Sequence, residues 1–260
     1  MKELKLTSVM NKNIVSSVFN DGEILEIIAA FKSSNELIGD GKRNVIKNVN
    51  FKNQKLTVKS FKKPHLINSV VYGFLRKSKA ERSFKYAKIL TCKGIGTPKP
   101  IGYVECFNFR RLTKSYYVSE YVDCDLTFRE INKDFKSFKS KKILKAFTKF
   151  MLRVHENDIL FHDNSPGNTL IKKTGKSYEF YLVDLNRMSF KKLTLHDRIN
   201  NFSRLTTKKK IIKIMSKEYA KLTYNDKTNI FEIMNMSIRK FQHKFVTKKK
   251  IKRKLKFWKK

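Results

Sequence analysis

Residues 158–190 read DILFHDNSPGNTLIKKTGKSYEFYLVDLNRMSF, and three polar side chains in this stretch indicate its chemistry. Asp163 and Asn168 lie five residues apart, and Asp184 follows the short apolar run 181–183. One carboxylate can orient an attacking hydroxyl and accept its proton, while an amide oxygen and a second carboxylate can hold Mg²⁺. The pattern therefore predicts phosphoryl transfer, with Asp163 as the base and with Asn168 and Asp184 as metal ligands.

The spacing of these side chains has a geometric reason. A proline followed by a glycine bends the loop between Asp163 and Asn168, so that both side chains can face the same cleft. Residues 169–171 and 179–183 have the composition of short strands, and the segment between them contains a glycine turn. We expect a hairpin that returns Asp184 to the side of Asn168.

The stretch resembles the catalytic core of the protein-kinase-like superfamily. Residues 154–163 (VHENDILFHD) are similar to the end of the long kinase helix and its catalytic loop, and residues 184–186 (DLN) stand where kinases carry the metal motif DFG. FHD in place of HRD and DLN in place of DFG favour kinases of small substrates over regulated protein kinases. With the segments IGDGKRN (38–44), SPGN (165–168) and VDLNRM (183–188), the pattern resembles the bacterial lipopolysaccharide kinase family.

This resemblance, which covers roughly residues 35–210, implies both a fold and an activity. The implied fold is α+β and two-lobed, protein-kinase-like, with a small antiparallel-sheet N-lobe and a mainly helical C-lobe. The implied activity is that of a phosphotransferase with an alcohol group as acceptor, using ATP and Mg²⁺. Its acceptor would be a sugar hydroxyl, of Kdo or heptose, in the lipopolysaccharide inner core, presented by lipopolysaccharide or a lipid A–core molecule.

Two other hypotheses remain open. The first is a kinase-like enzyme that acts on another small molecule or on a protein; the absence of an APE motif disfavours proteins, and the positive charge disfavours cationic aminoglycosides. The second is a non-catalytic basic adaptor for membranes or nucleic acid. The presence of all three base and metal positions favours an enzyme, because pseudokinases commonly lose one of them.

Nucleotide-binding residues are expected in the sheet-forming part of the chain. Residues 36–38 and 45–49 are predicted strands, and the turn between them contains Gly39 and Gly41. In the lobe implied by the resemblance, this turn would lie over the nucleotide phosphates. The sequence Gly-Asp-Gly is also an ordinary hairpin signal, so the turn alone does not identify a phosphate loop.

Lys59 ends the predicted strand 56–59 as the lysine of the kinase VAIK strand does. The resemblance implies that this lysine binds the α- and β-phosphates of the nucleotide and forms an ion pair with a glutamate on the next helix. Glu81, in the predicted helix 78–90, is the only carboxylate between Asp40 and Glu105 and is therefore the predicted partner. The alternative is that Glu81 pairs with the lysine one helical turn later, Lys85.

The kinase hinge, which recognises adenine through its backbone, is expected after the strands 101–105 and 116–121. The resemblance places Glu120 and Val122 there, as nucleotide-binding positions. Residues 134–157 have the apolar period of one long amphipathic helix that leads to the catalytic loop.

Five further polar residues surround the predicted loop. The helix-end histidine, His155, is interpreted as structural, and His162 as a residue that orients the loop. Three arginines are expected to be exposed to solvent, with an anionic acceptor as the alternative partner: Arg187, Arg198 and Arg204.

The composition limits the partners of the protein. The chain has 59 basic and 22 acidic residues, a formal net charge of +37, which favours polyanions, although a base-composition bias of the genome also contributes to such a lysine excess. Three cysteines without a CXXC motif indicate neither a disulfide framework nor a zinc site. We expect no secretory signal at the start of the sequence and no apolar run near the ~20 residues that span a bilayer.

The sequence divides into an N-terminal helical extension (1–34), an N-lobe (35–122), a C-lobe with the catalytic loop (123–246) and a basic tail (247–260). Nine of the fourteen tail residues are basic, and apolar residues including the single Trp lie among them. Such a tail suits the interface of an anionic membrane. We therefore expect a cytoplasmic protein, peripheral on the inner face of the inner membrane; nucleic acid is the alternative partner, and solvent exposure without a partner the third interpretation.

Overall fold

The computed structural model describes residues 10–38, 44–62, 77–109, 111–136 and 138–257. The chain forms two compact units, Met1–Asp123 and Cys124–Lys260. The turn with Gly39 and Gly41, the apolar segment 67–75 and Trp258 lie outside the described residues.

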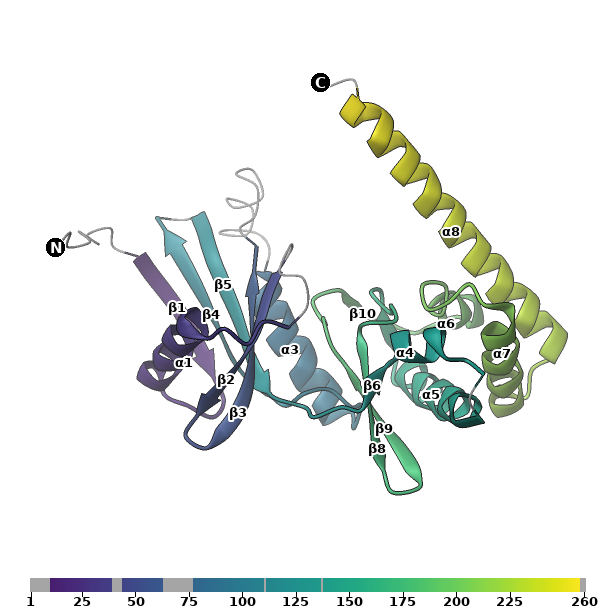
Figure 1. Ribbon diagram of the computed structural model, residues 1–260, viewed down its shortest axis with the longest axis horizontal. Helices are drawn as coiled ribbons and strands as arrows, with labels where there is room; N and C mark the ends of the chain where they lie inside the picture. The colour runs from purple at the N-terminus through teal and green to yellow at the C-terminus, as the bar shows by residue number, and fades with distance from the viewer. Residues whose placement is uncertain (1–9, 39–43, 63–76, 110, 137, 258–260) are drawn as a thin grey trace. The chain divides into compact units, whose positions relative to one another are not determined.

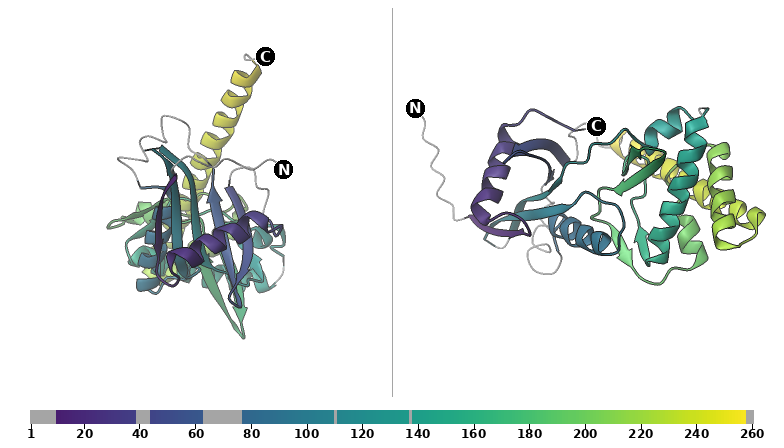
Figure 2. Two further views of the ribbon diagram at one scale, coloured as in Figure 1. Left: turned by 90° about the vertical axis from the view of Figure 1, so that its left-hand side faces the viewer. Right: turned by 90° about the horizontal axis from the view of Figure 1, so that it is seen from below.

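The N-terminal unit is built on a five-stranded antiparallel sheet in the order β1-β4-β5-β3-β2 (Figure 1). Successive residues of a strand face opposite sides of the sheet, so each side has its own apolar core. One side packs on helix α1 and the other on helix α3, and the right-hand view of Figure 2 shows the two helices apart. The bounds are β1 (Met10–Ser16), α1 (Asp21–Ser33), β2 (Asn44–Phe51), β3 (Gln54–Phe61), α3 (Lys79–Cys92), β4 (Pro100–Asn108) and β5 (Arg111–Glu120).

Three details of the N-terminal unit differ from the sequence prediction. The segment before residue 35 is more than a helical extension, because β1 pairs with β4 and belongs to the sheet. Helix α1 is capped by Asn20, in a capping box with Glu23, which the sequence prediction did not include. The predicted strand 36–38 is reduced to an isolated antiparallel bridge of Leu37 to Lys47 in β2, with the N–H of Ile38 donating to the carbonyl oxygen of Ile46 at 2.8 Å, and its side chains are exposed.

The C-terminal unit is mainly helical, with short strands that carry the predicted loop. Its core is formed by side chains of α5, α7 and α8 together with the strands β7 and β9. The bounds are β6 (Leu126–Thr127), α4 (Phe128–Lys133), α5 (Phe138–Glu156), β7 (Ile159–Phe161), β8 (Thr169–Thr174), β9 (Ser177–Leu182), β10 (Met188–Phe190), α6 (Leu195–Asn200), α7 (Lys209–Thr223) and α8 (Lys227–Phe257).

Helix boundaries in this unit also correct the prediction. The long helix begins at Phe138 and not at residue 134, and a separate short helix, α4, ends at Lys133; Thr127 and Glu130 start α4 with a capping box. Position 247 is not a structural boundary, because α8 continues through it to Phe257. None of the helices in the described ranges is long and apolar enough to cross a membrane.

Candidate active site

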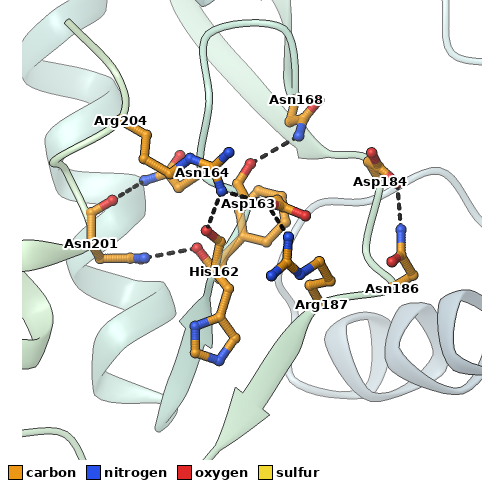
Figure 3. Close-up of polar contacts among 10 residues, drawn as sticks. His162, Asp163, Asn164, Asn168, Asp184, Asn186, Arg187, Asn201 and Arg204 are labelled. Carbon is orange, nitrogen blue, oxygen red and sulfur yellow. Dashed lines mark hydrogen bonds and ion pairs between the residues drawn. The ribbon is translucent and has the colours of Figure 1, made fainter. Parts of the chain in front are cut away.

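Asp163 lies in the loop that follows β7, and buried amides fix the shape of this loop (Figure 3). Asn201 donates from Nδ2 to the carbonyl oxygen of Phe161 at 2.7 Å, and Asn164 donates to the carbonyl oxygen of Asn201 at 3.0 Å. Both amide side chains are nearly excluded from solvent. A buried polar group is costly without its partner, so these bonds hold the loop in one conformation.

His155 contacts the side chain of Asn201 and so helps to hold it in place. Its Nε2 lies 3.1 Å from Asn201 Oδ1, and its Nδ1 lies 3.1 Å from the hydroxyl of Tyr219. The side chain is fully buried, and this burial lowers the pKa of His155 to about 4, although the bond to Asn201 acts in the opposite direction. His155 is therefore neutral at pH 7, and its contacts match the structural role inferred from the sequence.

The buried His155 should make stability depend on pH. Because its pKa falls from 6.5 to about 4 on folding, the unfolded state binds more protons between these values, and stability is lost as the pH drops through this range. The loss due to this one group should reach about 3 kcal/mol at pH 4. The measurement is urea denaturation of wild type and His155→Gln over a pH series. We expect the difference between their free energies of unfolding to shrink by that amount from pH 7 to pH 4. A difference that stays constant from pH 7 to pH 4 contradicts the prediction.

Asp163 is contacted by two arginines. Arg204 is partly buried, which corrects its default assignment to solvent, whereas Arg187 is 62% exposed. Arg204 contacts Asp163 Oδ1 through Nη1 and donates from the same nitrogen to the carbonyl oxygen of His162 at 2.9 Å. Arg187 Nη1 lies 3.5 Å from the same carboxylate oxygen. The carboxylate is thus held by charges from two segments far apart in sequence. The sequence offered no signal for this contact, because Arg204 lies 41 positions after Asp163 in a region without a motif.

His162 turns away from Asp163, toward β10, as Figure 3 shows. Its Nε2 lies 2.7 Å from the Ser189 hydroxyl, and its backbone N–H donates to the carbonyl oxygen of Arg187 at 3.1 Å. Burial, together with the charge of Arg187, lowers the pKa of His162. The contacts connect the loop to β10, so Asp163 remains the better candidate for the base.

Asn168 closes the loop and presents its amide oxygen. Its Nδ2 donates to the carbonyl oxygen of Asp163 at 2.8 Å, which assigns the donor end of the amide to the loop itself. The guanidinium of Arg129 lies directly against Gly167, so a side chain at this position would require that guanidinium to move. The remaining oxygen, Oδ1, is the end of Asn168 that a metal ion can use.

The β8–β9 hairpin brings Asp184 next to Asn168. The register of the hairpin pairs Thr169 with Leu182, and the N–H of Val183 donates to the carbonyl oxygen of Asn168 at 3.0 Å. Asp184 has a φ of +62°, a left-handed conformation that Asp and Asn tolerate better than most residues. Asn186 Nδ2 donates to Asp184 Oδ1 at 2.6 Å. The predicted return of Asp184 toward Asn168 is therefore present (Figure 3).

The donor set of these two residues fits Mg²⁺. A carboxylate and an amide oxygen are hard oxygen ligands, and Mg²⁺ commonly binds one or two carboxylates and completes its shell with water and phosphate oxygens. The described residues contain no group of three His, Cys, Asp or Glu side chains that could hold a metal by themselves. A cation at Asp184 and Asn168 would therefore need the phosphates of a nucleotide, as in kinases.

The predicted nucleotide-binding pair lies in the N-terminal unit, on the side of the sheet that packs on α3. Lys59 in β3 is 9% exposed, and its amine lies 5.2 Å from the centre of the Phe61 ring. Glu81 in α3 forms its ion pair with Lys85, one helical turn away, at 2.6 Å. The structure thus shows the alternative partner for Glu81, and a Lys59–Glu81 pair remains a prediction.

The other predicted nucleotide positions are Glu120 and Val122, next to the boundary between the two units. Glu120 is the last residue of β5; its N–H donates to the carbonyl oxygen of Lys99 at 2.9 Å, and its carboxylate lies 3.2 Å from the amine of Lys99. Val122 follows in irregular backbone. Adenine recognition at these positions stays a prediction.

An antiparallel-sheet unit with a buried strand lysine, followed by a helical unit with an Asp–Asn loop and a strand-end Asp, is a protein-kinase-like fold. No protein-family model matches the sequence, and no curated protein matches it either. Among solved structures, the chain is similar to WaaP in complex with acyl carrier protein, with a TM-score of 0.59 and 12% identity. The match covers 88% of this chain and 98% of the WaaP chain. The predicted α+β, two-lobed kinase-like fold is thereby confirmed.

Proposed function

We propose that the protein is an ATP- and Mg²⁺-dependent kinase that phosphorylates a sugar hydroxyl, of Kdo or heptose, in the lipopolysaccharide inner core. The observation that carries this proposal is the assembly of Asp163, Asn168 and Asp184 on one loop and hairpin. The motif resemblance to the lipopolysaccharide kinase family and the fold shared with WaaP support the choice of acceptor.

Asp163 would orient the acceptor hydroxyl and take up its proton. Both arginine contacts are made to Oδ1, and among the described residues no side chain bonds Oδ2, so Oδ2 is the oxygen available to the acceptor. As the bond from the acceptor oxygen to the γ-phosphorus forms, the bond from that phosphorus to ADP breaks, and the hydroxyl proton passes to Asp163. Bound ATP would supply the phosphoryl group, and Mg²⁺ would neutralise negative charge on the phosphates. Asn168 and Asp184 would hold the cation, and Lys59 would contact the phosphates.

The direct test is incubation of the purified protein with Mg-ATP and dephosphorylated lipid A–core acceptors, analysed by mass spectrometry. We expect a mass increase of one phosphate on the core sugars, absent without Mg²⁺. The same assay with a generic protein substrate and with an aminoglycoside tests the alternative acceptors. ATP turnover with either of these, and none with lipid A–core, would reject the lipopolysaccharide acceptor.

The C-terminal helix supports a peripheral position on the anionic inner face of the inner membrane. The first half of α8 packs on α6 and α7, whereas its second half extends beyond them (Figure 1). In this outer half Phe245 and Ile251 are 57% and 52% exposed, and exposed lysines lie between them. Apolar side chains among basic ones favour insertion into the headgroup region, with about 1 kcal/mol from each basic residue near the surface.

Deletion of residues 247–260 should release the protein from anionic vesicles and slow it on a lipid-embedded acceptor. A soluble, deacylated acceptor should be phosphorylated as before, because the predicted catalytic residues precede α8. Co-sedimentation with anionic and neutral vesicles over a salt series, with RNA and acyl carrier protein as competitors, measures the effect.

The matched control removes four exposed lysines of α7 by substitution with glutamine: Lys209, Lys210, Lys213 and Lys217. It changes the net charge but leaves the basic end of α8 intact, so vesicle binding should persist. Equal vesicle binding by full-length and truncated protein, or displacement of the vesicles by RNA at physiological salt, would contradict the membrane role.

A further inference from the structure

Arg187 has a fixed position beside the catalytic loop. It directly precedes β10, whose pairing with β7 sets Met188 opposite Phe161. The carbonyl oxygen of Arg187 accepts the backbone N–H of His162 at 3.1 Å. Its backbone is therefore anchored one residue from Asp163, and Figure 3 shows its guanidinium on the same side as the Asp163 carboxylate.

The two arginines at Asp163 have different surroundings. Arg204 is 34% exposed; it bonds the Asp163 carboxylate and the carbonyl oxygen of His162, and its guanidinium lies 5.4 Å from the centre of the Phe241 ring in α8. Arg187 is 62% exposed, and within the described ranges its guanidinium has one polar contact, a nitrogen 3.5 Å from Asp163 Oδ1. An exposed pair at this distance contributes little to stability, so holding Asp163 does not account for Arg187.

The Asp163 carboxylate does not need both guanidinium groups. It faces two of them, and Arg204 alone provides it with a close partner. The second carboxylate of the site, Asp184, accepts a bond from Asn186 at 2.6 Å and is assigned to the metal ion in the proposed function. The largely exposed guanidinium of Arg187 is thus available to an anion beside the oxygen atoms where an acceptor hydroxyl would bind. Guanidinium groups bind carboxylates and phosphates with two parallel bonds.

We propose that Arg187 binds an anionic group of the acceptor, a carboxylate or a phosphate, next to the hydroxyl that Asp163 orients. This inference rests on the proposed function and narrows its substrate class to hydroxyl compounds that carry a negative charge near the phosphorylated position. A neutral sugar would lack the partner of Arg187 and would bind less tightly. Arg187 is then a specificity-determining residue, and Arg204 positions the base.

The test compares wild type, Arg187→Gln and Arg187→Lys on matched acceptor pairs. One pair is a sugar acid and its methyl ester, and the other is a sugar phosphate and the same sugar without phosphate, so that the two sources of the anion are distinguished. For the preferred anionic acceptor, Arg187→Gln should raise KM about 10- to 100-fold, the range of a lost hydrogen bond to a charged group, with kcat within about twofold. Arg187→Lys should recover part of the loss, and neutral acceptors should not respond. The control, Arg239→Gln, removes an exposed arginine of α8 and should leave KM unchanged.

Binding of the acidic sugar and the sugar phosphate is also measured by calorimetry without ATP. This separates the inference from the proposed function. If wild type binds the acidic sugar through Arg187 but phosphorylates no acceptor, anion binding by Arg187 is supported and the proposed kinase activity is rejected. Transfer by wild type with no preference for anionic acceptors rejects the inference alone. A fall in kcat on both members of each pair, with KM and binding unchanged, would mean that Arg187 acts only on Asp163 and would overturn the proposal. Thermal unfolding confirms that each variant is folded.

Discussion

Asp163→Asn is expected to lower the rate of phosphoryl transfer at least ~100-fold while Mg-ATP still binds. Asparagine has the same shape but cannot accept the proton of the acceptor hydroxyl. It also leaves Arg204 without the negative charge that it contacts in the native loop. Because Asn168 bonds the backbone carbonyl of Asp163 and not its side chain, the metal ligands should keep their places. Turnover of a core acceptor, together with fluorescence titration of a labelled nucleotide, measures the two effects separately.

Asp226→Asn is the matched control for this substitution. Asp226 Oδ1 accepts the N–H of Asn229 at the start of α8, a capping role that asparagine fills equally well. This variant should have normal turnover and stability. Near-native turnover in purified Asp163→Asn would remove Asp163 from the role of base and direct the search to another proton acceptor.

Asp184→Asn should abolish the part of nucleotide binding that depends on Mg²⁺ and reduce turnover by at least about 100-fold, since a metal ion contributes several kcal/mol of charge stabilisation. The substitution suits this position because asparagine also tolerates the left-handed backbone observed at φ +62°. Loss of activity therefore cannot be attributed to backbone strain. Nucleotide titrations with Mg²⁺ and with EDTA measure the metal-dependent part.

Asn186→Ala provides the comparison for Asp184. It removes the side chain that donates to Asp184 Oδ1 but keeps the carboxylate, so it should weaken metal-dependent binding less than Asp184→Asn does. If wild type and Asp184→Asn bind Mg-ATP equally and turn over at the same rate, the metal site must lie elsewhere in the chain.

The fold and the core of the site were accessible from sequence because their signals are local. Asp163 and Asn168 lie five positions apart. The hairpin that brings Asp184 back to Asn168 consists of two consecutive strands joined by a glycine turn. Helix α3, predicted over 78–90 and found at Lys79–Cys92, was accessible from the same kind of local pattern. Short-range spacing was sufficient wherever neighbouring residues decide the geometry.

Contacts that depend on distant segments were not accessible in this way. Strand β1 joins the sheet by pairing with β4, about ninety residues later, and its polar sequence gave no sign of it. Arg204 reaches Asp163 only after the chain has passed through β10 and α6. For Glu81 two partners were possible; the ion pair with Lys85 at i+4 is present, as expected for neighbours on a helix, and the pair with Lys59 stays a prediction.

The contact between Arg204 and the ring of Phe241 decides where on α8 a label can be attached without disturbing the candidate site. Phe241 touches the arginine that holds the Asp163 carboxylate, so a fluorophore or an affinity handle near this turn would disturb the site that it is meant to report on. Four residues later Phe245 is 57% exposed, and the helix beyond it carries no buried side chain in its described part. A label for spectroscopy beyond this point would leave the Asp163 site undisturbed, although it would lie in the part of α8 that we propose to bind membranes.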